Sequence, residues 1–304
     1  MSLMRTGVGS LPHRDLDEAV AFVEATADIP YLPQLPNRNE QESMLVQWGS
    51  GIAGAGAEGT SLVRGGTVGD RSEGFAGAAA MLQSLDSTIV KTQTTGPVTI
   101  AAALRAGGVN TPELMHVVTQ ELGRRIRSHL RWIRSESDVH DVVLILDEPA
   151  LAAVGGGDLP KMARDALTTL QDSIDTGVGL HCCGDTDWGS IAEIGFDWLS
   201  WDLGALDEGF FRGVDRIAEA LGAGTRLMWG IVPTTPGPLP EIHVLMGRYG
   251  TAVANLIVAG APFEKLKADA WFTPACGLAG LSVSDAEKVA DKLLEVVGEV
   301  ESGW

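Results

Sequence analysis

Short apolar runs alternate with longer amphipathic stretches along the whole chain, and this alternation constrains the fold more than any other feature. Each run has the length of a strand, and each is followed by at least one stretch with helical periodicity. Strands that alternate with helices predict an α/β fold with a parallel sheet. Eight such units favour a single (β/α)8 TIM barrel over residues 1–304. A doubly wound open sheet is the alternative.

The expected strands are Thr6–Leu11, Ile29–Gln34, Thr88–Thr94, Val142–Asp147, Val178–Cys183, Trp198–Leu203, Arg226–Val232 and Lys267–Phe272. The expected helices are Asp15–Thr26, Asn39–Trp48, Gly74–Gln83, Val98–Ala106, Thr111–Ser135, Leu159–Asp175, Trp188–Ile194, Asp207–Leu221, Leu239–Ala259 and Ser284–Val297. A glycine-rich segment, Ser50–Gly74, reads as a long flexible excursion after the second strand, a common place for a lid or binding loop.

Composition narrows the possible partners and the compartment. The net charge of −18 argues against nucleic acid and anionic membranes, which need a basic surface. Three cysteines cannot build a disulfide framework, and two of them are neighbours, which suits metal binding or catalysis in a reducing compartment. We see no signal peptide and no uninterrupted apolar stretch of membrane-spanning length. These features predict a cytoplasmic protein.

His181 and Cys183 end an apolar run that starts at Val178. Residues i and i+2 of a strand face the same side, so the imidazole and the thiol should point into one space. Cys276, in a turn near the last expected strand, can add a second thiol. One His and two Cys form a zinc-type ligand set with room for a fourth partner. We therefore predict Zn²⁺ as the cofactor, and zinc can hold a thiol as its reactive thiolate.

Two acidic positions close apolar strands. Asp147 and Glu148 end one strand before Pro149, and an unpaired buried carboxylate costs free energy. Asp147 is either a helix N-cap or a functional carboxylate that could bind a substrate ammonium group. Asp202 is either a direct oxygen ligand of the metal, a buried hydrogen-bonded side chain, or a partner of His181.

Several of these stretches together resemble the catalytic half of cobalamin-independent methionine synthase, which is 5-methyltetrahydropteroyltriglutamate–homocysteine S-methyltransferase. That half belongs to a superfamily of barrels shared with uroporphyrinogen decarboxylase. The matching stretches are colinear with the family and span nearly the whole chain. They are Val8-Gly9-Ser10 with Pro12, Gly96-Pro97-Val98-Thr99, Asp147-Glu148-Pro149-Ala150-Leu151, His181-x-Cys183 and Cys276-Gly277-Leu278.

The resemblance implies a zinc-dependent methyltransferase that methylates a thiol, homocysteine, to methionine. It implies that zinc is bound by His181, Cys183, Asp202 and Cys276, with Asp in place of the usual Glu. It also implies that Ser10 and Asp147 hold the amino-acid end of homocysteine. A glutamate after the second strand is expected to help, and Glu42 is the match, with Glu40 as the alternative.

The departures from the family concern the methyl donor. The half of the long enzymes that helps to bind polyglutamyl folate has no counterpart here, and Ala101–Ala103 occupy the region of a family tryptophan. A family histidine after the seventh strand is replaced by Gly230–Thr235. We therefore expect a donor other than polyglutamyl folate. The resemblance to corrinoid-linked methyltransferases leaves a methylated corrinoid protein as a possible partner, and a zinc- and thiol-binding homologue without catalysis is the further alternative.

Overall fold

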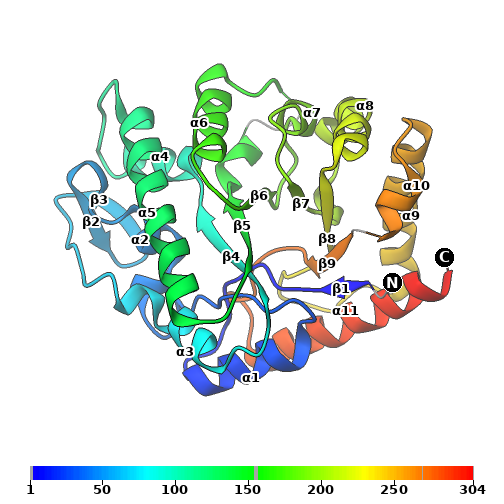
Figure 1. Ribbon diagram of the computed structural model, residues 1–304, viewed down its shortest axis with the longest axis horizontal. Helices are drawn as coiled ribbons and strands as arrows, with labels where there is room; N and C mark the ends of the chain where they lie inside the picture. Colours follow the sequence, from blue (N-terminus) through cyan, green and yellow to red (C-terminus); the bar gives the residue numbers. More distant parts are fainter. Residues whose placement is uncertain (1–2, 154–156, 269, 304) are drawn as a thin grey trace.

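A parallel sheet of seven strands forms the centre of the computed structural model, which describes residues 3–153, 157–268 and 270–303 (Figure 1). The strand order is β1-β9-β8-β7-β6-β5-β4, and every pairing in it is parallel. The order follows the chain without reversal, which is the order of a barrel and not of a doubly wound sheet. The strands are β1 (Met4–Arg5), β4 (Ile89–Thr95), β5 (Asp141–Asp147), β6 (Gly177–Cys182), β7 (Trp198–Asp202), β8 (Arg226–Val232) and β9 (Trp271–Pro274).

The expected second strand, Ile29–Gln34, does not form a regular strand. It makes only isolated parallel bridges, Tyr31 with Lys91 and Ser10 with Gln34. Pro30 and Pro33 explain this, because proline has no N–H to donate to a ladder. The structure therefore supports an α/β fold with a seven-stranded curled parallel sheet rather than eight regular strands.

The bounds expected for the first and last strands also need correction. The first regular strand covers only Met4–Arg5, earlier than the expected Thr6–Leu11. The last begins at Trp271, because the chain up to Ala268 is helical. The expected strand Lys267–Phe272 also includes residue 269, which lies outside the described residues.

Helices lie along the convex side of the sheet (Figure 1). They pack there because each carries a buried stripe, as in α5, where Leu122, Ile126 and Ile133 lie on one face. The helices are α1 (Leu16–Thr26), α2 (Met44–Gly49), α3 (Ala76–Ser84), α4 (Pro97–Ala106), α5 (Leu114–Glu136), α6 (Lys161–Asp172), α7 (Trp188–Ala192), α8 (Glu208–Ala223), α9 (Ile242–Val258), α10 (Phe263–Ala268) and α11 (Val283–Gly303). Within the described ranges no helix is long and apolar enough to cross a membrane.

The glycine-rich segment is more regular than its composition suggests. It contains an antiparallel hairpin of β2 (Ala55–Glu58) and β3 (Ser61–Arg64). The hairpin packs on α4, and a Cβ atom on Gly107 would lie 1.9 Å from the Leu62 carbonyl oxygen. The expectation of a flexible excursion is therefore wrong for this part of the segment.

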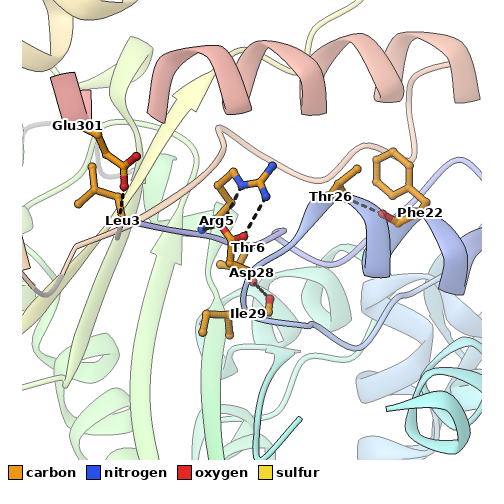
Figure 2. A network of polar contacts seen from close by, with 8 residues as sticks. All are labelled: Leu3, Arg5, Thr6, Phe22, Thr26, Asp28, Ile29 and Glu301. Carbon is orange, nitrogen blue, oxygen red and sulfur yellow. Dashed lines mark hydrogen bonds and ion pairs between the residues drawn. The ribbon is translucent and has the colours of Figure 1, made fainter. Parts of the chain in front are cut away.

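The N-terminal strand is fastened at both of its flanks (Figure 2). The Arg5 guanidinium donates two hydrogen bonds of 2.9 Å to the Asp28 carboxylate, and Thr6 Oγ1 donates to the Ile29 carbonyl. On the other side, the Leu3 N–H donates to Glu301 on α11. These contacts join the start of the chain to the segment before Tyr31 and to the last helix.

The concave side of the sheet is filled by two layers of side chains. The lower layer is apolar, and Trp198 and Trp271 stack in it with ring centroids 4.2 Å apart. The upper layer lies two residues further along the same strands. It contains the buried polar side chains of Asp147 on β5, His181 on β6 and Ser200 on β7. It lies at the carboxyl ends of the strands, where barrel enzymes place their active sites.

Candidate metal centre

Three donor side chains meet at the carboxyl ends of the strands. His181 lies on β6, Cys183 follows directly after β6, and Cys276 follows β9. Their ligand atoms all lie within 4.8 Å of one another, with the imidazole buried and both thiols half-buried. The sequence expectation that these residues come together is confirmed in its geometry. Cys182, between them, lies in the apolar core, as the alternation of a strand requires.

The imidazole of His181 is oriented by a residue that sequence reasoning missed. Its Nδ1 lies 2.9 Å from Ser200 Oγ, and the two residues are register partners on β6 and β7. Its Nε2 is buried and has no hydrogen-bond partner among the described residues. A hydrogen bond at one ring nitrogen commonly fixes the other as the metal-binding nitrogen. Ser200 lies two residues before Asp202 on the same face, and this spacing was the available signal.

The two thiols differ in proton affinity. The pKa of Cys183 is lowered, first by its interaction with the Cys276 thiol and then by His181. The pKa of Cys276 is raised, because its protonated thiol is held by a hydrogen bond to the Cys183 sulfur and because the site is buried. Thiolate is the form that binds metal. A thiolate, a second thiol and a buried imidazole nitrogen without a partner fit the donor set of Zn²⁺, and the structure describes no other such group of three.

Asp147 and Glu148 are adjacent in sequence but have different roles. Asp147 is in register with His181, and its Oδ1 is buried without a hydrogen-bond partner among the residues that the structure describes. Burial raises the pKa of Asp147 to about 6, against the opposing effects of His181 and Lys91. Because no described residue donates to this oxygen, Asp147 does not cap a helix through it, and the substrate-binding role expected for Asp147 stays a prediction.

Glu148 is the capping residue of the pair. Its carboxylate accepts hydrogen bonds from the Val98 N–H at 2.8 Å, and from the N–H and hydroxyl of Thr99 at 2.7 and 2.6 Å. These donors belong to the first turn of α4, whose N–H groups have no partners within the helix. Burial still raises the pKa of Glu148 to about 7. A Cβ atom on Gly96 would lie 2.2 Å from Glu148 Oε1, so this position requires glycine.

Two polar residues of β4 also face the concave side, and sequence reasoning missed both. Lys91 Nζ donates a 2.8 Å hydrogen bond to the Val8 carbonyl, and burial lowers the pKa of Lys91 to about 8. Gln93 Nε2 donates to the Leu32 carbonyl, while its Oε1 is buried without a partner among the described residues. Lys91 and Gln93 lie two positions apart in an expected strand and therefore on one face, and this spacing could have indicated them.

Ser10 lies beside the sulfur group. The Leu278 N–H donates to the Ser10 carbonyl at 2.7 Å, and a Cβ atom on Gly277 would lie 2.0 Å from Ser10 Oγ. The backbone thus places the Ser10 hydroxyl next to the residue that follows Cys276.

The remaining expected site residues have other partners. Asp202 lies outside the three-residue group, and its Oδ1 accepts from the Gly204 N–H at 2.7 Å. Burial raises the pKa of Asp202, and the nearby Cys183 raises it further. Glu42 is fully buried, forms a 2.8 Å ion pair with Arg38 and accepts from the Gly77 N–H at 3.1 Å. The roles expected for Asp202 and Glu42 stay predictions.

A curled parallel sheet with an imidazole and two thiols at its carboxyl edge defines a barrel-type α/β protein with a candidate thiolate metal centre. No family model matches the chain. A curated methionine synthase from Methanothermobacter marburgensis is 26% identical over 196 residues, which cover 64% of this chain and 57% of that protein. The chain is thus matched to little more than half of the length of this relative.

Solved structures of similar fold cover the chain almost completely. A B12-independent methionine synthase from Shewanella sp. W3-18-1, in complex with selenomethionine, has a TM-score of 0.65 and 12% identity, and the match covers 100% of this chain and 99% of that chain. A methyltransferase from Methanosarcina mazei has a TM-score of 0.62 and 14% identity, with 99% and 94% covered. The resemblance to the methionine synthase family is therefore confirmed, in sequence by the curated relative and in fold by the solved structures.

Proposed function

We propose that this protein is a zinc-dependent methyltransferase that methylates the thiol of homocysteine to give methionine. The observation that carries the proposal is the group formed by His181, Cys183 and Cys276, with the buried Nε2 of His181 left without a partner. Bound Zn²⁺ would supply a lower proton affinity for the substrate thiol while leaving its sulfur nucleophilic. The similarity to methionine synthases supports the same chemistry.

The residues around the metal centre would position the substrate. Asp147, buried and with Oδ1 unpartnered, suits the ammonium group of an amino acid. The Ser10 hydroxyl would bind the carboxylate end. In the reaction, the thiol loses its proton, the sulfur forms a bond to the methyl carbon, and the donor leaves with the electron pair of its broken bond. The chain contributes mainly by alignment of these atoms.

A fourth metal ligand and a closed barrel belong to the same proposal. Asp202 is the proposed oxygen ligand when zinc is bound, because its carboxylate is near enough to Cys183 for the charge of that residue to raise its pKa. We further propose that the segment Ile29–Gln34 occupies the position of the eighth strand of a barrel. Its backbone bonds to both neighbours support this, because Leu32 N–H donates to Lys91 and Gln34 N–H donates to Gly9. The reduced thiols suit a cytoplasmic enzyme.

The donor is proposed to be something other than polyglutamyl folate. The region of the missing family tryptophan is Ala101–Ala103 on α4, and Gly230–Thr235 at the end of β8 has no histidine. A methylated corrinoid protein, free methylcobalamin or a simple sulfonium compound would then supply the methyl group. A homologue that binds zinc and thiol without catalysis is the second candidate, favoured by the same missing histidine.

Metal analysis tests the centre directly. Wild-type protein, reconstituted with zinc and then dialysed, should retain about one zinc per chain, and Cys276→Ser should lose most of it. Cys182→Ala is the matched control, because Cys182 is a neighbouring thiol that lies in the core, and it should retain zinc. Equal zinc in the wild type and in Cys276→Ser would remove Cys276 from the ligand set.

Turnover then separates the two candidate functions. Transfer to homocysteine should be faster from methylcobalamin, a methylated corrinoid protein or a sulfonium donor than from polyglutamyl methyltetrahydrofolate at equal concentration. Fastest turnover with the folate would overturn the donor proposal. Zinc and homocysteine binding without transfer from any donor would favour the non-catalytic homologue.

A further inference from the structure

A cavity lies on the convex side of the sheet, away from the metal centre. Its volume is about 520 Å³, within the usual range for sites that bind small molecules. Its walls come from α5, from the start of α3 and from the end of the glycine-rich segment, which contributes Arg71. His129 in its wall bonds to Thr92 on the outer face of β4, which fixes the cavity outside the barrel interior.

One wall of this cavity is aromatic. Phe75, His129 and Trp132 form a ring cluster, with centroids 5.0 Å apart for Phe75 and His129 and 5.4 Å for His129 and Trp132. Phe75 and Trp132 are only half-buried, so part of each ring faces the cavity. A flat ring of a ligand could stack on this wall in the offset or edge-on arrangements that aromatic pairs prefer.

The rest of the cavity carries an excess of positive charge. Three arginines line it, and two of them, Arg124 and Arg125, share a single carboxylate, Glu121. The guanidinium of the third, Arg71, forms no hydrogen bond or ion pair within the described part of the chain, although the charge of Glu121 also acts on it. Partial desolvation at the cavity wall and the neighbouring Arg125 lower the pKa of Arg71 to about 10. Arg71 is an exposed residue, and it stays charged near neutral pH.

The positive charge of this cavity contrasts with the negative net charge of the whole chain. With a net charge of −18, the surface repels anions in general, and a cluster of guanidinium groups beside an aromatic wall is an exception to that trend. Arginine binds carboxylate and phosphate through paired N–H donors and also stacks on flat rings. The aromatic wall therefore favours a ligand with a flat ring, and the arginines favour a ligand that also carries an anionic group.

We propose that this cavity binds a small ligand in which a flat aromatic ring carries an anionic group, with the ring on Phe75 and Trp132 and the anion at Arg71. A nucleotide or an aromatic carboxylic acid would each meet this description. The glycine-rich segment would then serve to bring Arg71 to the cavity. The proposal does not depend on zinc or on methyl transfer.

Calorimetric titration with two pairs of probes tests the proposal and identifies the source. AMP is compared with adenosine, and indole-3-acetate with indole. At least one of the two anions should bind with a Kd below about 1 mM, and at least about tenfold more tightly than its neutral counterpart. Ribose 5-phosphate, which has the anion without an aromatic ring, should bind at least about tenfold more weakly than AMP if AMP is the tighter anion.

Variants locate the binding. Arg71→Met should weaken binding of the anion at least about tenfold, and Trp132→Leu should weaken it as well. Arg105→Met, which removes an exposed arginine of α4, is the control and should leave the affinity unchanged. Cys276→Ser should also bind the anion normally, because the metal centre is separate.

Three outcomes would overturn the proposal: neither anion binds below about 1 mM, the neutral counterpart binds as tightly as its anion, or Arg71→Met binds like the wild type. If Arg71→Met fails to fold, its circular dichroism will show this, and the decision then rests on Trp132→Leu and the neutral probes.

Discussion

Ile145 and Asp147 lie two residues apart on β5, yet they belong to regions of opposite character. Ile145 is part of the lower layer on the concave side, with Trp198, Met228 and Trp271. Asp147 is part of the upper layer, where the His181 Nε2 and the Asp147 Oδ1 are buried and have no hydrogen-bond partner in the described part of the chain. The same strands thus supply a packed apolar layer and a polar layer that holds the candidate site. Two side chains on the same face of one strand, two residues apart, can therefore differ in role: one packs in the core and the other lies in the candidate site.

The lower layer should show the largest effect on stability. Trp198 is fully buried, stacks on Trp271 and carries the Arg226 guanidinium 4.1 Å from its ring centroid. We expect Trp198→Ala to lower the free energy of unfolding by about 3–5 kcal/mol, because the cavity left behind cannot fully collapse. Denaturant unfolding followed by circular dichroism measures the loss. The control, Phe211→Ala on the exposed side of α8, should change the free energy by less than about 1 kcal/mol. A small effect of Trp198→Ala would mean that the layer is not a stabilising core.

Glu148 should behave as a stability residue although it borders the polar layer. Its carboxylate accepts three hydrogen bonds from the start of α4. In Glu148→Gln, the amide nitrogen would face a backbone N–H, so we expect the free energy of unfolding to fall by about 1.5–3 kcal/mol. Thermal and denaturant unfolding measure this fall. Unchanged stability would show that α4 does not depend on this cap.

Asp147→Asn should change substrate affinity and leave stability intact, the opposite of what we expect for Glu148→Gln. Homocysteine binding should weaken about tenfold, because one charge-assisted hydrogen bond is lost. The free energy of unfolding should not fall, since the variant removes a buried carboxylate without a partner at Oδ1. Calorimetry with the zinc-loaded protein measures the affinity, and denaturant unfolding measures the stability. If Asp147→Asn lost stability and kept its affinity for homocysteine, the roles assigned to Asp147 and Glu148 would have to be exchanged.

Lys91 joins the two layers and should make the stability of the protein depend on pH. It is in register with Val143 of the lower layer, while its amine reaches the Val8 carbonyl. Its pKa falls from 10.5 to about 8 on folding, so between these values the unfolded chain binds more protons than the folded protein. The contribution of Lys91 to stability should therefore rise with pH across this window and be lost as the pH falls through about 8.

Lys91→Met isolates that contribution. The difference in unfolding free energy between wild type and variant, measured from about pH 7.5 to about pH 10.5, should shift in favour of the wild type as the pH rises. Parallel stability profiles would show that Lys91 keeps its ordinary pKa in the folded protein.

The sequence predicted the strands with long apolar runs and the place where their ends meet. His181, Cys183 and Cys276 could be found because their chemistry is rare and their spacing follows the alternation of a strand. The assignment of Asp147 and Glu148 could not be made in the same way. The deciding partners, Val98 and Thr99, are far away in the sequence, and only the folded sheet brings them to Glu148.

Other failures had local causes. The sequence of Ile29–Gln34 is apolar enough for a strand, but its two prolines remove the donors of a regular ladder. The glycines of the 50–74 segment suggested flexibility, whereas close contacts such as that of Gly56 with the Gly66 carbonyl require residues without side chains. Ser200 was missed because a serine in a strand carries no distinctive signal until its neighbour in the next strand is known.

The pairing of β1 with β9 has a consequence for the order of events on the ribosome. Met4 lies beside Trp271, and Ser10 lies against Gly277, so the part of the chain that carries Cys276 packs on the N-terminal part. The pairing of β9 with β8 brings Cys276 to the edge of the sheet that holds His181 and Cys183. During synthesis, His181 and Cys183 emerge long before Cys276 does. The nascent chain would therefore expose an incomplete donor pair, and the full set would exist only once β9 has paired with β8.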